Sequence, residues 1–459
     1  MTPLRRILIA NRGEIAMRII RTCRALGIET VLAVSEADRE SMPARAADRA
    51  VCIGPARALD SYLRTETIVH AALGTQSQGI HPGYGFLSER SALARLCEEQ
   101  GVIFIGPTAA QIEAVGDKLR ARAEAQRAGV PVVPGGAVTS PIEADSLARQ
   151  IGVPLLVKAV GGGGGRGMKR VDRLEDLPHA LQLASAEAGA AFGDARVYLE
   201  HFVTRGRHIE VQVLGDGTGQ VIHLGERDCS VQRRYQKLIE ETPAPGLTQS
   251  LRERIQQAGA RFAHCLAYRG AGTVEFLVDV ARDAFFFLEM NARIQVEHPV
   301  TEAVTGVDLI AEQLAIASGQ GLRLSQADVR PRGCAIECRV NAEDPARDFQ
   351  PSPGRVSEVA WPSGAGIRVD TYIGSGSVVP PFYDSLMAKI IAHAPDRASA
   401  LQRLRAGIGS ARVAGVASNL PFHARVLDDA EFQAGGVDTG FVARLLERGR
   451  GASDPPRDP

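Results

Sequence analysis

The sequence predicts a mixed α/β fold that is divided among several domains. The chain has 459 residues, and at roughly 100 to 200 residues per domain this length indicates about two to four domains. The N-terminal part alternates short apolar runs with segments of helical periodicity, which is typical of a parallel sheet covered by helices. From about residue 332 the chain becomes rich in short strands and turns instead.

Composition narrows the function classes. Lys+Arg and Asp+Glu are both 53, so the formal net charge is zero; this argues against a general nucleic-acid binder but leaves room for a local basic pocket. The seven cysteines are scattered without a CxxC pair, which predicts free thiols in a reducing compartment. Neither a signal peptide nor an apolar run of membrane-spanning length is apparent. We therefore expect a soluble cytoplasmic protein.

Short apolar runs at Arg6–Ala10, Thr30–Ser35 and Gly101–Pro107 predict buried strands of the N-terminal sheet. Between the first two, Gly13–Gly27 carries apolar side chains at helical spacing and ends in glycine, so it predicts a helix. The first strand–helix turn, ANRGEIA, holds a single glycine. The fingerprint of a dinucleotide-binding loop is therefore missing there.

Helices and strands continue through the rest of the chain. Apolar spacing predicts helices at Asp117–Gly129, Leu174–Ala188 and Leu251–Ala267, and a strand at Val153–Val160. The stretch Arg207–Asp228 predicts a hairpin, because its two apolar runs flank the turn sequence GDGTG. The C-terminal part adds strands such as CAIECRVNAE and SLMAKIIAHA, then a helix, DRASALQRLRAGI, and a Pro- and Asp-rich tail.

A run of glycines, Gly161–Gly167, admits three interpretations. A dinucleotide loop needs a helix directly after it, but the following MKRV is typical of a strand. A Walker loop needs Gly-Lys-Ser/Thr, and Gly167 is followed by Met168. The third interpretation is a flap between two strands that covers phosphates with its backbone N–H groups, with Lys158 as a point charge for the same phosphates. A plain flexible linker is the alternative.

Two carboxylates predict a metal site. Glu275 and Glu289 lie on strand-like segments joined by the turn sequence DVARD, so a hairpin would place them side by side. Asn291 follows on the same side. Carboxylate and amide oxygens are hard ligands that suit Mg²⁺ or Mn²⁺ bridging nucleotide phosphates. The alternative is a buried ion pair with a nearby arginine.

The stretch Phe287–Glu302, FLEMNARIQVEHPVTE, alternates polar and apolar residues. If its backbone stays extended, one side carries the polar set and the other the apolar set. The preceding AFFFL is apolar on both sides, as in a doubly buried strand, so the polar row is predicted to emerge from the interior of a sheet. A solvated face is the alternative, although two carboxylates, two amides and a guanidinium are unusual there. The polar set is Glu289, Asn291, Arg293, Gln295 and Glu297.

The segment Arg227–Glu241 places four cations near an acidic pair. A nucleic-acid loop, a surface charge run and an anion pocket are the three interpretations, and the zero net charge argues against the first. Cys229 lies in this segment, but no base points to it in the sequence. We treat that thiol as structural or incidental.

Together these segments resemble the biotin carboxylase component of biotin-dependent carboxylases, members of the ATP-grasp superfamily. The resemblance extends from about Arg6 to Leu446. It rests on the motifs IANRGEIA, HPGYGFLSE, GDK, KAVGGGGGRGM, RHIEVQVL, ERDCSVQRR, EMNARIQVEHPVTE, ECRVNAEDP and FYDS.

The resemblance implies a domain order and a reaction. It implies a Rossmann-like domain over residues 1–115, an ATP-grasp domain over 116–331 with a mobile lid at about 132–204, a β-rich C-terminal domain over 332–447 and a disordered tail over 448–459. ATP would phosphorylate bicarbonate to carboxyphosphate, and biotin would then be carboxylated. This is the first half-reaction of an acetyl-CoA or other acyl-CoA carboxylase.

The resemblance also implies residue roles. Expected ATP contacts are Lys118, Lys158, Gly164, Gly165, Glu200, His201, Phe202, Val203, His208, Tyr235, Glu275 and Glu289. Expected ligands of Mg²⁺ or Mn²⁺ are Glu275, Glu289 and Asn291. The bicarbonate pocket would comprise Lys237, Arg293, Gln295, Val296 and Arg339, and Tyr84 and Arg339 would contact biotin. The catalytic set would be Arg293, Lys237, Glu297 as the base for bicarbonate, and Arg339 as the cation that stabilises the biotin enolate.

Two positions depart from the family pattern. Tyr235 stands where many members have a histidine that contacts the ribose. A phenol can still hydrogen-bond a hydroxyl group, so we expect altered ATP affinity and retained function. Ala292 stands where threonine is frequent, on the apolar side of the row, and we expect an effect on packing alone.

Two other function classes remain open from the residues. Another ATP-grasp enzyme, such as a carboxylate–amine ligase or a carbamoyl phosphate synthetase, would not need the C-terminal motifs. A non-catalytic nucleotide-binding regulator would lack a base or a metal ligand. The sequence shows no biotinyl segment of the Met-Lys-Met type and no room for a carboxyltransferase, so we expect a separate biotin carboxyl carrier protein and separate carboxyltransferase subunits. The resemblance implies a homodimer, and the final carboxyl acceptor stays open.

Overall fold

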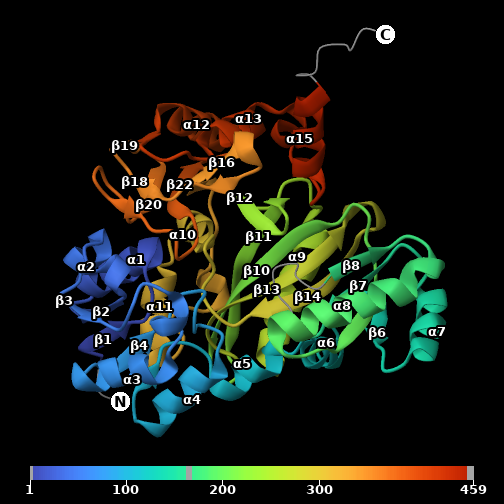
Figure 1. Cartoon of the computed structure of the whole chain (residues 1–459), viewed down its shortest axis with the longest axis horizontal. Helices are drawn as coiled ribbons and strands as arrows, with labels where there is room; N and C mark the ends of the chain where they lie inside the picture. The colour runs from blue at the N-terminus through green and yellow to red at the C-terminus, as the bar shows by residue number, and fades with distance from the viewer. Residues whose placement is uncertain (1–3, 162–167, 452–459) are drawn as a thin grey trace.

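The computed structural model describes residues 4–161 and 168–451. In Figure 1 the blue N-terminal part lies at the lower left, the green lobe at the right and the orange and red C-terminal part above. All seven cysteines fall within the described ranges and are free thiols, as predicted. No helix in these ranges is long and apolar enough to cross a membrane.

The N-terminal part is a parallel sheet covered by helices, as the alternating pattern predicts. Its strand order is β3-β2-β1-β4-β5, and every pairing in it is parallel. Helix α1 packs its apolar side chains Ile15, Ile19 and Cys23 against this sheet. The elements are β1 (Arg6–Ile9), α1 (Gly13–Ala25), β2 (Glu29–Val34), α2 (Met42–Ala46), β3 (Arg49–Cys52), α3 (Thr65–Gly74), β4 (Gly79–His81), α4 (Ser91–Glu99), β5 (Ile103–Phe104), α5 (Ala109–Gly116) and α6 (Lys118–Arg127).

The green lobe is a small antiparallel sheet with its own apolar core. Its described strands run in the order β6-β9-β7-β8. Strands β7 and β8 flank the glycine run and pair antiparallel, so MKRV is a returning strand as predicted. Residues 162–167 themselves lie outside the described ranges. The elements are β6 (Gly135–Ala137), α7 (Pro141–Ile151), β7 (Leu155–Ala159), β8 (Met168–Val171), α8 (Leu177–Phe192) and β9 (Val197–His201).

The largest sheet is antiparallel and has eight described strands, in the order β14-β13-β10-β11-β12-β15-β22-β20. The sheet contains strands from both sides of the expected domain boundary at residue 332, because β12 pairs with β15. Residues from the central and the C-terminal parts of the chain therefore stand on one continuous surface. The strands are β10 (Arg207–Asp216), β11 (Val221–Arg233), β12 (Gln236–Thr242), β13 (Arg269–Asp279), β14 (Ala284–Asn291), β15 (Cys334–Asn341), β20 (Ile367–Thr371) and β22 (Leu386–Ala394).

Helices cover this sheet and complete the C-terminal core. Helix α10 packs against β12, β15 and β22, and α9 packs against β10 and β11. The helices are α9 (Gln249–Cys265), α10 (His298–Thr305), α11 (Leu309–Ala317), α12 (Arg397–Ser410), α13 (Leu420–Asp428), α14 (Ala430–Ala434) and α15 (Phe441–Gly451).

Two predictions need correction. The row after Glu289 does not stay extended to Glu297: β14 ends at Asn291, and the chain bends before α10 begins at His298. Glu89 accepts hydrogen bonds from the Ala292 backbone and from Arg293 at this bend, and Pro299 then fits the first turn of α10. At the C-terminus, residues 448–451, expected in the disordered tail, belong to α15. Phe441, earlier in that helix, packs in the C-terminal core.

Candidate active site

A cavity of about 1090 Å³ lies between the small sheet and the eight-stranded sheet. Residues of β7 and β9 line it together with residues of β10, β12, β13, β14 and β15. Nearly all predicted site residues in the described ranges line this cavity, namely Tyr84, Lys118, Lys158, Glu200, His201, Phe202, Val203, His208, Tyr235, Lys237, Glu275, Glu289, Asn291, Arg293, Gln295, Val296 and Arg339. Glu297 is fully buried and contacts the lining residues Lys237 and Arg339. Gly164 and Gly165 lie outside the described residues.

The predicted hairpin brings the two carboxylates together. Glu275 of β13 and Glu289 of β14 are paired residues in neighbouring strands. A short 3₁₀ turn at Val280–Arg282 joins these strands, as the DVARD sequence predicts. Asn291 donates a hydrogen bond from Nδ2 to Glu275 at 2.9 Å. The side chain of Glu289 is one-third exposed, with Lys118 Nζ at 3.5 Å from its carboxylate.

The environment of Glu275 keeps it ionised. Burial alone would raise its pKa, but Lys237 and His208 lower the pKa well below its ordinary value. Lys237 Nζ lies 3.0 Å from one carboxylate oxygen, and His208 Nε2 lies 3.0 Å from the other.

Of the three predicted metal ligands, the two carboxylates are placed to bind a hard divalent cation, but the amide oxygen of Asn291 is not. Glu275 and Glu289 present carboxylate oxygens to the cavity, which suits Mg²⁺. Asn291 turns its nitrogen to Glu275 and its oxygen to Arg293. It therefore needs a turn of its amide group before the oxygen could ligate a metal.

Lys237 is the central cation of the site. Its Nζ donates hydrogen bonds to Glu210 at 2.6 Å, to Glu275 at 3.0 Å and to Glu297 at 2.8 Å. Glu297 also accepts a hydrogen bond from Arg339 Nη2 at 2.8 Å. Although burial would raise the pKa of Glu297, Lys237, Arg339 and the nearby Arg227 lower it well below its ordinary value. Glu297 is therefore ionised, and its basicity stays low while Lys237 and Arg339 hold it.

Arg293 holds the bend after β14 in place. Its Nη1 donates to Gln295 Oε1 and its Nη2 donates to Asn291 Oδ1, each at 2.9 Å. Its Nε donates to Glu89 Oε2, also at 2.9 Å. The polar row thus stays on the cavity side after the strand has ended. The alternative of a solvated face is wrong.

The opposite wall contains a buried ion-pair group. Lys158 Nζ donates to Glu200 Oε2 at 2.8 Å across the β7–β9 pair. Arg122 of α6 donates to the other oxygen of Glu200 at 3.0 Å and also to two backbone carbonyls, those of Val133 and Gly135. Burial would lower the pKa of Lys158, but Glu200 and Tyr198 raise it above its usual value. Lys158 is therefore a permanent cation at the cavity wall.

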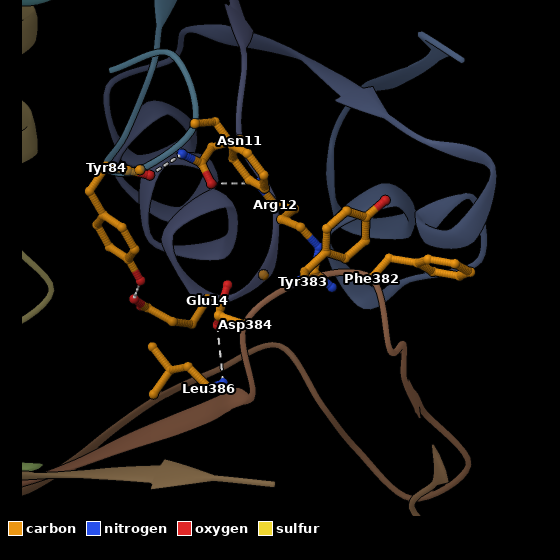
Figure 2. Close-up of a pocket in the computed structure, with 11 residues that line it drawn as sticks. Asn11, Arg12, Glu14, Tyr84, Phe382, Tyr383, Asp384 and Leu386 are labelled. Atoms are coloured by element: carbon orange, nitrogen blue, oxygen red, sulfur yellow. Dashed lines mark hydrogen bonds between the residues drawn. The ribbon is translucent and has the colours of Figure 1, made fainter. Parts of the chain in front are cut away.

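A smaller cavity of about 270 Å³ adjoins the large one, and both share Tyr84 and Asp384 in their lining. Figure 2 shows Tyr84 pointing its hydroxyl group at Glu14, which accepts a hydrogen bond from it. The other carboxylate oxygen of Glu14 lies 3.0 Å from Lys389 Nζ. Lys389 in turn donates to the backbone carbonyl of Val296 at 2.8 Å. A buried chain of contacts thus joins the two cavities.

Several residues that support the site were not predicted. Glu210, Arg227 and Lys389 have no exposed side-chain surface, and Glu89 and Arg122 fix Arg293 and Glu200. Strand parity is the signal that could have found Glu210, since it lies two residues beyond His208 on the same face. Arg227 begins the cation-rich segment Arg227–Glu241, whereas no local pattern indicates Lys389, Glu89 or Arg122.

Cys229 is a buried thiol, in agreement with the expected structural or incidental role, although a carboxylate that the sequence did not indicate lies beside it. Its Sγ lies 3.8 Å from Glu297 Oε1. Burial and the neighbouring Glu210 raise the pKa of this thiol well above its ordinary value. The thiol therefore stays protonated and is not a nucleophile.

Family models cover almost the whole chain. The biotin carboxylase N-terminal domain matches residues 3–112 and the biotin carboxylase C-terminal domain matches residues 337–444. The ATP-binding domain of the carbamoyl-phosphate synthase L chain matches residues 117–325. The C-terminal match separates this chain from the other ATP-grasp ligases considered above.

Full-length relatives agree with these matches. The biotin carboxylases of Nostoc sp. and Pseudomonas aeruginosa are each 50% identical to the chain and align with 96% of it and 99% of their own length. A pyruvate carboxylase subunit from Methanothermobacter thermautotrophicus is 47% identical over 95% of the chain and 89% of its own length.

Solved structures show the same fold. The biotin carboxylase domain dimer of Hydrogenobacter thermophilus 2-oxoglutarate carboxylase, in complex with MgADP, ADP and bicarbonate, superposes with a TM-score of 0.94 at 44% identity, covering 97% of this chain and 99% of that one. The biotin carboxylase of Campylobacter jejuni, in a β,γ-ATP complex, gives 0.93 at 42% identity, covering 96% and 99%. The chain therefore belongs to the biotin carboxylase family of ATP-dependent ligases.

Proposed function

We propose that the large cavity binds MgATP, bicarbonate and the ureido ring of biotin next to one another, for the ATP-dependent carboxylation of biotin that this family performs. The observation that carries the proposal is Glu297. It is fully buried, ionised and held by Lys237 and Arg339, at the point where the polar row meets the cavity.

The nucleotide would lie against both walls of the cavity. Lys118 and Lys158 would supply cations for the phosphates, and the family resemblance assigns backbone donors for them to Gly164 and Gly165. The remaining contacts would come from Glu200, His201, Phe202, Val203, His208 and Tyr235. Glu275, Glu289 and Asn291 would hold Mg²⁺ or Mn²⁺, which offsets negative charge on the phosphates when it is bound.

Bicarbonate would lie between Arg293, Gln295, the Val296 backbone and Lys237. Its hydroxyl proton would move to Glu297, so that the resulting carbonate oxygen attacks the γ-phosphorus of ATP and ADP leaves. The arriving anion also competes for the hydrogen bonds of Lys237. This weakens the hold of Lys237 on Glu297 and raises the basicity of that carboxylate at the moment when it is needed.

Biotin would enter from the side of Tyr84. Arg339 would supply the cation that stabilises the enolate as biotin N1′ becomes a nucleophile. Arg339 lines the cavity and contacts Glu297, so the base and the enolate-stabilising cation are adjacent.

We also propose the wider setting. The domain division at residues 1–115, 116–331 and 332–447 agrees in its order with the three family matches. A homodimer is supported by the Hydrogenobacter domain dimer. A separate biotin carboxyl carrier protein and separate carboxyltransferase subunits are supported by a relative that is named as a subunit. The seven free thiols support a cytoplasmic location.

Bicarbonate-dependent ATP cleavage, measured with and without free biotin, tests the central role of Glu297. We expect Glu297→Gln to lower both rates by roughly 10²-fold or more, because the amide cannot accept the proton. Glu241→Gln is the matched control. That glutamate is also buried, but it pairs with Arg397 at 2.6 Å, away from the cavity. Full activity of Glu297→Gln would show that another group is the base.

A further inference from the structure

Two buried carboxyl side chains lie side by side behind Arg339 and have no part in the roles above. Glu240 of β12 and Glu337 of β15 are paired residues of neighbouring antiparallel strands, and both are completely buried. Paired residues point to the same face, with Cβ atoms about 5 Å apart. Arg339 lies two residues beyond Glu337, so it shares that face.

The two carboxyl groups have different partners. Glu240 accepts a hydrogen bond from Arg339 Nε at 2.5 Å, and the same guanidinium reaches Glu297 at 2.8 Å. Within the described part of the chain, neither carboxyl oxygen of Glu337 has a hydrogen-bond partner, and the second oxygen of Glu240 has none either. A bare carboxylate without a partner is among the most costly groups to bury.

The charged groups that face Glu337 do not neutralise it. They are Glu240 on β12, Arg339 on its own strand, Lys389 on β22 and Glu297 at the start of α10. Lys389 is already engaged with Glu14 at 3.0 Å and with the Val296 carbonyl at 2.8 Å.

The nearest packing around Glu337 is apolar. Its partner on β22 is Ile391, which packs with Val300 and Val304 of α10. Burial, only partly offset by Lys389, and the charge of Glu240 raise the pKa of Glu337 well above its ordinary value. Burial also raises the pKa of Glu240 to about 7, although Arg339 opposes the rise.

We propose that Glu240 and Glu337 hold one proton between them, carried by Glu337, and that they act as positioning residues for Arg339 in the biotin step. With Glu337 neutral, Arg339 faces one anion from behind, Glu240, and one from the cavity side, Glu297. A second ionised carboxylate behind it would draw the guanidinium away from the cavity, where enolate charge develops. The proposal rests on the proposed role of Arg339.

Kinetics with three glutamine variants test the positioning role. Glu337→Gln keeps the shape and the neutral charge, so we expect both reactions to stay within about twofold of wild type. Glu240→Gln removes an anchor of Arg339. We expect biotin-dependent turnover to fall roughly tenfold in kcat, while bicarbonate-dependent ATP cleavage without biotin stays within about threefold. Glu241→Gln, on the opposite face and paired with Arg397, should change neither reaction.

The pH profile adds a readout that a purely structural effect would not move. Wild-type biotin-dependent turnover should show an ionisation near the pKa of Glu240, about 7, and Glu240→Gln should lack it. If Glu337→Gln lost as much biotin-dependent turnover as Glu240→Gln, the proposal would be wrong. Equal losses in both reactions of Glu240→Gln would also overturn it.

Thermal unfolding across pH tests the proton itself, without any assay of activity. A proton that Glu337 keeps in the folded state, but loses in the unfolded state, makes wild-type stability fall as pH rises above the unfolded pKa. Glu337→Gln removes this fall, so its advantage in Tm over wild type should widen between about pH 5 and about pH 8. A constant difference would show that Glu337 is ionised in the folded protein.

An infrared difference spectrum between wild type and Glu337→Gln gives a direct check. It should contain the C=O band of a protonated carboxyl group, and its absence would overturn the proposal. A wrong assignment of Arg339 would give a different set of results from a wrong assignment of the proton. If Arg339→Lys kept full biotin-dependent turnover, the assigned role of Arg339 would fall, while the thermal and infrared results would stand.

Discussion

At the scale of single residues, the chemistry of the site depends on which buried carboxylates have cations beside them. The polar identity of residues 289–297 could be predicted from the sequence, because alternation after a doubly apolar run is a local pattern. Several residues that hold the site in place were not predicted: Glu89 binds Arg293, Glu210 binds Lys237 and Arg122 binds Glu200. Strand parity could have indicated Glu210, but Glu89 and Arg122 come from distant segments that only the folded chain brings to the site.

Arg293 allows a test at this scale. Its fork makes three hydrogen bonds at 2.9 Å, to Glu89, Asn291 and Gln295. Lysine carries the same charge but cannot reproduce planar, bidentate geometry. We expect Arg293→Lys to raise the KM for bicarbonate by about tenfold or more and the KM for ATP by less than about threefold.

Steady-state kinetics with each substrate varied in turn measures the two effects. Lys169→Arg is the control, because it exchanges the same two residue types in the opposite direction at a position on β8, away from this bend. An equal rise in both KM values would show that Arg293 supports the whole cavity and does not select bicarbonate.

At the scale of elements, hairpins were predictable because turn chemistry and strand parity are local. The β13–β14 hairpin is confirmed down to the pairing of Glu275 with Glu289. The end of β14 was not predictable, since parity alone does not show where a strand bends. The bend depends on Glu89, which accepts hydrogen bonds from the Ala292 backbone and from Arg293.

The two-residue turn between β11 and β12 offers an element-level prediction. Arg234 and Tyr235 both have positive φ, 49° and 66°, a conformation that asparagine and glycine adopt far more easily. Replacing the pair by Asn-Gly should stabilise the hairpin by about 1 kcal/mol. It should also weaken ATP binding, because the Tyr235 side chain that lines the cavity is lost.

Urea unfolding and ATP titration measure these two opposing effects. Tyr235→His keeps a hydrogen-bonding side chain at the cavity and should retain more ATP affinity than the Asn-Gly turn. If the Asn-Gly variant bound ATP as tightly as wild type, Tyr235 would have no role in nucleotide binding.

At the scale of the whole molecule, buried polar contacts join parts of the chain that are far apart in sequence. Glu14 of α1 pairs with Lys389 of β22, and neither side chain is more than 1% exposed. Lys389 also supports the Val296 carbonyl. The family motifs predicted the domain order, but they did not predict the Glu14–Lys389 ion pair. Neither residue lies in a local pattern that indicates a partner so distant in the sequence.

A double-mutant cycle tests that link. Lys389→Met leaves the Glu14 carboxylate buried without its cation, so we expect a loss of about 3–5 kcal/mol in the free energy of unfolding. Adding Glu14→Gln should recover part of this loss, because the unpaired charge is then gone. Denaturant unfolding of wild type, both single variants and the double variant gives the coupling energy. Simple additivity would show that the two side chains do not interact.

The pairing of β12 with β15 also limits how this enzyme can be divided. A fragment that stopped near residue 332 would lack β15 and would leave the edge of the largely buried strand β12 without hydrogen-bond partners. Such an exposed edge pairs readily with strands of other molecules, so we expect the fragment to aggregate. If the C-terminal part of a relative replaced that of this chain, its β15 would have to pair with β12 in the same hydrogen-bond register. Recombination is therefore best made at surface loops, with the strands of the large sheet exchanged as one block.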